Sequence, residues 1–173
     1  IDALVNRIYV LGETTGEANE MIAAEVKAAD EIRTYLASGT TEGLLPKDKA
    51  VRSPLSAAAY MGYPNVVAAL LSSDLVKEHI NDADETGITP WIASVMSMRQ
   101  SAWSCNPKIF EDPFRFVPML VTQPYYLSIK PSPYKKVRDL LEQAGASASM
   151  EQAKNAWLTN CKFQSEEGRD KIK

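Results

Sequence analysis

The feature that most constrains this chain is the stretch from Asp84 to Pro90, which reads DETGITP. It combines an acidic pair, a glycine two residues after it and a final Thr-Pro. A Thr-Pro pair is typical of a helix start, because the threonine hydroxyl can cap the first turn and proline has no N–H to leave unpaired there. A related ending, Ser53-Pro54, lies 36 residues upstream. This repetition indicates a chain built from similar units.

The units read as pairs of helices. Ser53 opens an alanine-rich helix, Gly62 breaks it, and Pro64 is suited to start a second helix with an apolar stripe over 66–71. The stretch 79–87, which precedes the second Thr-Pro helix start, contains residue types that are typical of a turn.

These motifs together resemble the ankyrin repeat, with the better matches covering residues 48–103 and weaker ones at 30–39 and 137–146. The resemblance implies an all-α fold, an ankyrin-type solenoid of helix pairs with short β-turn fingers. Thr-Pro-Leu-His, the consensus start of the repeat, is replaced here by Ser53-Pro54-Leu55-Ser56 and by Thr89-Pro90-Trp91-Ile92. The bracing histidine is missing from both, so we expect three to four repeats, with unusual packing around Trp91.

The chain is expected to form one ankyrin-repeat domain over residues 1–173. Its expected parts are N-terminal helices and a cap (1–39), the best-matched repeats (40–103), a Pro- and aromatic-rich insertion or degenerate repeat (104–136), a C-terminal repeat helix and cap (137–162), and a tail (163–173).

Helices are predicted before the first repeat over 2–11 and over about 16–38, with Gly39 ending the second. In the connection that follows, Asp48 occupies the place of Asp84, but Val51 stands where the later turn has a glycine. We therefore expect the two turns to differ in shape.

The repeat pattern breaks after Trp103. Ser53 precedes Leu70 of its partner helix by 17 residues, whereas Thr89 precedes Leu140 by 51. The excess of 34 is close to one repeat of about 33 residues, so residues 104–136 are either a degenerate repeat or a long insertion. Six prolines in this segment favour an irregular insertion with one short helix near 114–121. Its aromatic side chains suit either interface anchors or burial within the insertion.

A final helix is predicted from Met150 to Cys161, with Met150, Ala153, Trp157 and Cys161 on one face, followed by a charged tail that frays. Cys105 and Cys161 are too few for a disulfide scaffold. They are either two buried thiols or one possible disulfide, which would favour an oxidising compartment.

Composition limits the partners. The net charge is −3, and lysines and arginines are scattered, so no nucleic-acid partner is predicted. No apolar run approaches the roughly 18 residues that cross a bilayer, so no membrane span is expected. The chain begins at Ile1. It is expected to be periplasmic or secreted if a signal peptide preceded this residue, and cytoplasmic otherwise. We expect a monomer without a cofactor or bound metal.

The ankyrin resemblance places the variable contact positions on the fingers and at the ends of the first helices. The corresponding partner-binding residues here are Lys49, Ala50, Arg52, Tyr60, Met61, Asp82, Glu85, Thr86, Ile88, Met96 and Ser97.

The resemblance therefore predicts a non-enzymatic protein–protein interaction module. The expected single-domain organisation and the loss of consensus residues suggest a dedicated inhibitor or immunity-like partner of one protein. The alternative is an enzyme, or an enzyme's accessory subunit, with a site built by the insertion around Cys105 and His79. Sequence patterns typical of phosphate loops, nucleophile elbows and zinc proteases are absent, so no catalytic residue is predicted.

Overall fold

The described part of the chain is helical. A computed structural model describes residues 18–99 and 133–170, and these ranges contain helices and no strand, which confirms the all-α prediction for them. Side chains are described except at residue 18 and over 97–99 and 161–170. In chain order the helices are α2 (Ala18–Ala37), α3 (Pro54–Met61), α4 (Pro64–Leu70), α5 (Asp74–Glu78), α6 (Pro90–Arg99), α8 (Pro133–Gln143) and α9 (Met150–Asp170).

The predicted helix starts are confirmed by their caps. The Oγ of Ser53 accepts a hydrogen bond from the backbone N–H of Ser56 at 3.1 Å, where α3 begins. The Oγ1 of Thr89 accepts one from the N–H of Ile92 at 3.2 Å, where α6 begins. Each hydroxyl thus satisfies an N–H that the first helical turn would leave without a partner.

The break between α3 and α4 also follows the prediction. Gly62 ends α3 with φ +69° and ψ +44°, a left-handed conformation that glycine adopts without steric cost. Pro64 then stands in the first turn of α4, where its missing N–H leaves no hydrogen bond unmade. The chain therefore reverses within the two residues Gly62 and Tyr63.

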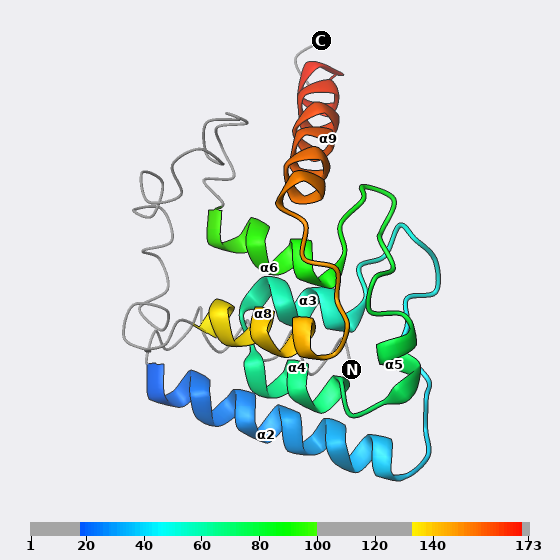
Figure 1. The fold of residues 1–173 in the computed structure, drawn as a ribbon, viewed down its shortest axis with the longest axis vertical. Helices are drawn as coiled ribbons and strands as arrows, with labels where there is room; N and C mark the ends of the chain where they lie inside the picture. Colours follow the sequence, from blue (N-terminus) through cyan, green and yellow to red (C-terminus); the bar gives the residue numbers. More distant parts are fainter. Residues whose placement is uncertain (1–17, 100–132, 171–173) are drawn as a thin grey trace.

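Two rows of stacked helices make up the fold (Figure 1). In one row α3 packs on α6 and α6 packs on α9, and in the other α2 packs on α4 and α4 packs on α8. The rows meet where α3 contacts α4 and where α6 contacts α8. A single apolar core runs between them, from Ile32 of α2 through Val67 of α4 to Ala153 of α9, each fully shielded from solvent.

A buried carboxylate joins the first two helices of the second row. Glu25 of α2 is 1% exposed, and its two oxygens accept from the N–H of Asn65 at 2.6 Å and from Nδ2 of the same residue at 3.1 Å. Tyr63 offers no side-chain cap to α4. Glu25 therefore caps a helix that lies 40 residues further along the chain, at the end where the helix dipole favours a negative charge.

Polar contacts also tie α8 to α6 and to α3. The Nε1–H of Trp91, on α6, donates to Oε1 of Glu142 at 2.8 Å. The hydroxyl of Tyr134, on the first turn of α8, donates to the backbone oxygen of Tyr60 at 3.3 Å. Tyr134 is 5% exposed, so this aromatic residue of the segment 104–136 is a core residue.

Two boundaries differ from the sequence prediction. The helix expected from Val137 begins at Pro133, since proline is tolerated in a first helical turn. The last helix does not end at Cys161 but continues to Asp170, because its glutamate, glutamine, lysine and arginine residues are good helix formers. On the same helix Met150 is 42% exposed, whereas Ala153 and Trp157 are buried as predicted.

Several predictions lie outside the described residues: the helix over 2–11, the short helix near 114–121, and Cys105. The side chain of Cys161 also lies outside them, so the disulfide stays a prediction. No helix in the described ranges has the length and apolar character needed to cross a membrane.

Candidate functional site

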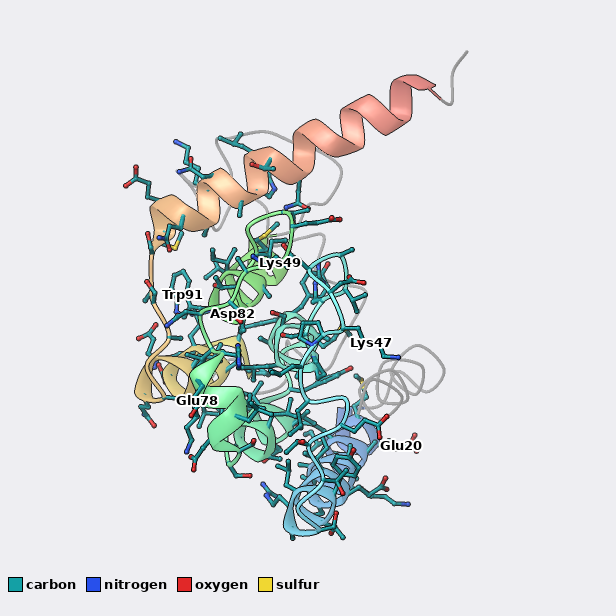
Figure 2. All side chains as sticks on the ribbon, turned by 90° about the vertical axis from the view of Figure 1, so that its right-hand side faces the viewer. Glu20, Lys47, Lys49, Glu78, Asp82 and Trp91 are labelled. Atoms are coloured by element: carbon teal, nitrogen blue, oxygen red, sulfur yellow. The ribbon has the colours of Figure 1, made fainter. Side chains whose placement is uncertain are left out.

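Two successive turns lie side by side at one edge of the stack and carry most of the predicted contact residues. We call residues 47–52 of the first turn and 82–86 of the second turn the turn face. Figure 2 looks onto this edge, with Lys47 and Lys49 labelled on the first turn and Asp82 on the second.

The second turn is organised by one carboxylate oxygen. Oδ1 of Asp84 accepts from the N–H of Thr86 at 2.9 Å, from the hydroxyl of Thr86 at 2.6 Å and from the N–H of Ile88 at 2.9 Å. The backbone closes the turn as well, because Gly87 donates to the oxygen of Asp84 at 3.0 Å. Aspartate is common in turns because its short side chain can accept hydrogen bonds from backbone N–H groups a few residues further along the chain.

The first turn repeats only part of this arrangement. Oδ1 of Asp48 accepts from the N–H of Ala50 at 2.9 Å, and the N–H of Val51 donates to the backbone oxygen of Asp48 at 3.3 Å. Gly87 has φ +79°, whereas no described residue other than glycine, and so not Val51, has a positive φ. The two turns begin alike and then differ in shape, as the valine predicts.

Backbone and side-chain hydrogen bonds fix the two turns to their neighbours. The N–H of Glu85 donates to the backbone oxygen of Lys49 at 3.0 Å, so the turns are joined directly. On the other side, Nδ2 of Asn81 donates to the oxygen of Gly145 at 3.1 Å and its Oδ1 accepts from the N–H of Ser147 at 2.7 Å. The second turn is therefore held between the first turn and the α8–α9 connection.

The first turn carries mostly positive charge, with Asp48 as its one acidic residue, and the second turn carries negative charge. Lys47, Lys49 and Arg52 lie on or beside the first turn and are exposed. Asp82 and Glu85 are exposed on the second turn. Within the described residues no ion pair involves Lys49 or Glu85, and Arg52 instead lies over the ring of Tyr60, with its Cζ 4.8 Å from the centroid.

His79 is paired with a carboxylate of the turn face. Its Nδ1 lies 2.7 Å from Oδ2 of Asp82, and the side chains of both residues are solvent-accessible. A histidine oriented by a carboxylate is one part of a nucleophilic site, but Cys105, the nucleophile of the enzyme hypothesis, lies outside the described residues. Among the described residues no group of three histidine, cysteine or acidic side chains could hold a metal ion.

One pKa in this region is perturbed. Asp74, in the first turn of α5, has a pKa lowered from the usual 3.8, because its carboxylate accepts a hydrogen bond from the ammonium of Lys77 and is attracted by its positive charge. The pair is exposed and lies outside the turn face.

A cavity of about 230 Å³ opens between the two turns, and we call it the turn cavity. Its walls come from the chain before α3, from α3 itself, from α5 and from the second turn. The lining residues are Leu44, Leu45, Pro46, Asp48, Lys49, Val51, Ser53, Leu55, Ser56, Val76, His79, Asp82, Ala83, Asp84 and Ile88.

The predicted contact residues fall into three groups. Lys49, Ala50, Arg52, Asp82 and Glu85 are exposed on the turns. Tyr60, Met61 and Thr86 are half-buried, and the hydroxyl of Thr86 is occupied by Asp84. Ile88 and Met96 are 3% and 7% exposed, so their side chains belong to the core and are not available to a partner. The side chain of Ser97 lies outside the described residues.

Sequence reasoning did not identify the turn cavity or the role of Asn81. The cavity depends on Leu44 and Val76, which are 32 residues apart and carry no pattern that marks them as neighbours. Asn81 could have been noticed, since an asparagine in a turn has both a donor and an acceptor for backbone groups.

Comparisons of the chain with models of known protein families, with curated proteins and with solved structures find no match.

Proposed function

We propose that this chain is a protein-binding module of the ankyrin type, and that its turn face makes the contact with the partner. The order of helix contacts supports the first part of the proposal. First helices stack on first helices (α3 on α6) and second helices on second helices (α4 on α8), with α2 and α9 at the two ends. A solenoid of this kind uses its projecting turns and concave side for binding, because each unit packs only on its neighbours.

The proposal that the turn face contacts the partner is supported by exposed charged side chains that stand on a backbone fixed by hydrogen bonds. Lys49 and Glu85 are exposed and have no ion pair among the described residues, yet the backbone hydrogen bond between the same two residues holds their Cα positions together. A partner that binds such a surface orders side chains but not loops, and this lowers the entropic cost of association. A surface whose first turn is mostly positive and whose second turn is negative also selects for a partner with the complementary arrangement.

A more specific form of this proposal is that the chain binds a single protein, as its dedicated inhibitor or as an immunity-like partner. A single captured protein that binds in a 1:1 ratio and loses an activity on binding would support this. Several unrelated captured proteins would contradict it.

Charge-reversal variants test the proposal. The partner is isolated with the tagged chain from the source organism, and its affinity is measured for Lys49→Glu and Glu85→Lys by calorimetry. We expect each to weaken binding at least about tenfold, because reversing a charge adds repulsion to the loss of attraction. The matched controls are Lys136→Glu on α8 and Glu151→Lys on α9, both exposed and outside the turn face.

The controls should change the affinity less than about twofold, as exposed charges outside an interface contribute little. If the two turn-face variants also stay within twofold of the native chain, the turn face is not the binding surface. Thr86 is not used as a test position, because its hydroxyl and its N–H both serve the turn itself.

A further inference from the structure

The floor of the turn cavity is apolar and well shielded. Leu44, Leu55, Val76 and Ile88 line it with exposures of 1–3%. They come from four different parts of the chain, so the cavity exists only when the two turns, α3 and α5 are packed together. Transfer of an apolar group from water to this apolar floor is favourable.

The size of the cavity limits what can enter. Its volume is about 230 Å³. An engineered apolar cavity of about 150 Å³ binds benzene, whereas pockets for drug-sized molecules and cofactors span roughly 300–1,000 Å³. The turn cavity is therefore large enough for one aromatic side chain and too small for most complete cofactors.

The rim of the cavity has more negative than positive charge. Asp48, Asp82 and Asp84 line it with a single cation, Lys49. His79 lies beside Asp82 and adds a full positive charge only when it is protonated. An aromatic group that enters with a cation attached is therefore favoured over the same group with an anion attached.

We propose that the turn cavity receives one aromatic side chain of the partner protein, and that a basic group next to this side chain contacts Asp82 at the rim. The inference rests on the proposed function and adds a specific anchor to it. Interfaces commonly gain most of their binding energy from a few residues, often aromatic or arginine, placed in shielded pockets, and the turn cavity is such a pocket, lined by residues of both turns.

Two small molecules test the cavity without the partner. The ¹H–¹⁵N spectrum of the full chain is recorded at constant pH during titration with tryptamine, an indole with a cation, and separately with indole-3-propionate, an indole with an anion. We expect tryptamine to shift amide signals of residues 44–56 and 76–88 in a saturable manner. Indole-3-propionate should bind about three- to fivefold more weakly, the size that an exposed charge interaction produces.

Filling variants show whether the shifts come from the cavity. Ala83→Leu places three more carbons on a lining residue, and Val51→Phe fills the cavity from its exposed side, where the fold tolerates a larger residue. Each should abolish the tryptamine shifts. Ala50→Leu is the matched control, because Ala50 lies in the same turn, is exposed and does not line the cavity. Binding to this control should be unchanged.

The charge contribution is tested separately. Asp82→Asn should reduce the preference for tryptamine over indole-3-propionate, whereas Glu78→Gln, an exposed residue outside the lining, should not. The inference is wrong if neither probe shifts these amides, if the anion binds as well as the cation, or if both filling variants leave the shifts intact.

Partner binding separates this inference from the function on which it rests. Affinity that falls with Glu85→Lys, at a position outside the cavity lining, but is unaffected by Val51→Phe keeps the turn face and removes the anchor. Affinity that is unaffected by Lys49→Glu, Glu85→Lys and Val51→Phe removes the proposed function, while the titration with the two indoles still reports whether the cavity accepts an aromatic cation.

Discussion

Replacement of Asp84 with alanine removes the oxygen on which the second turn is built. Three donors converge on Oδ1, the N–H and hydroxyl of Thr86 and the N–H of Ile88. The side chain of Ile88 is 3% exposed, so its N–H has limited access to water once the carboxylate is gone.

The expected loss of stability follows from these contacts. A net hydrogen bond contributes about 1 kcal/mol, and bonds to a charged group contribute more. Since one oxygen serves all three donors and Asp84 is half-exposed, we expect the free energy of unfolding to fall by about 2–3 kcal/mol. For a domain of this length, such a change lowers Tm by about 4–12 °C.

Urea unfolding followed by the helical circular dichroism signal measures the change. Asp84→Asn keeps an acceptor oxygen in place and should lose about 1 kcal/mol or less, since only the charge is removed. Asp82→Ala is the matched control in the same turn. Its carboxylate makes one exposed hydrogen bond with His79, so its loss should also stay below about 1 kcal/mol.

The relative order of the variants decides the outcome. If Asp84→Ala destabilises the chain no more than Asp82→Ala does, the Asp84 carboxylate does not organise the turn. Amide exchange gives an independent readout, because the N–H of Ile88 should lose protection in Asp84→Ala and keep it in Asp84→Asn.

Three further predictions concern other parts of the stack. Gly87→Ala should cost about 1–2 kcal/mol of unfolding free energy, because φ is +79° and the added Cβ meets no atom closer than 3.8 Å, so a loss near zero would show that the turn adapts. Trp91→Phe and Glu142→Ala should each lose about 1–2 kcal/mol in urea, and a double-mutant cycle without coupling would contradict the hydrogen bond between them. The carboxyl of Asp74 should titrate below pH 3.8 by NMR, and Lys77→Gln should raise its pKa toward that value, so an unchanged titration in the variant would refute the pairing. Because the pKa of Asp74 is lower in the folded chain than in the unfolded chain, the pair stabilises the fold fully above the unfolded-state pKa. This stabilisation is lost as the pH falls through the folded-state pKa.

The parts of the fold that could be predicted are those that depend on near neighbours in sequence. Ser53 and Thr89 each cap an N–H three residues ahead, and Gly62 ends a helix by its own conformation. Such contacts act within one turn of helix, so the residue types alone indicate them.

The parts that could not be predicted depend on residues far apart. Glu25 lies within an apolar stripe, and only the fold brings it to Asn65. The five-residue helix α5 has too few residues for a period to be recognised. Ile88 follows the glycine of a turn and was expected to face a partner, but the turn folds its side chain into the core. In the candidate site, the exposed charged residues of the two turns could be predicted from the sequence, but the turn cavity could not.

The unequal spacing of the two helix pairs has a consequence for how the chain folds. α3 and α4 are separated by two residues, whereas the 33 residues from 100 to 132 separate α6 from α8. In the unfolded chain, bringing together two segments that are 33 residues apart costs about 2–3 kcal/mol more entropy than bringing together two that are two residues apart. The pair α3–α4 with α2 is thus the part expected to form early, and docking of α8 the late step that completes the core. In kinetic studies, mutations at the α4–α8 contact should therefore act mainly on the unfolding rate, and those at the α2–α4 contact on the folding rate.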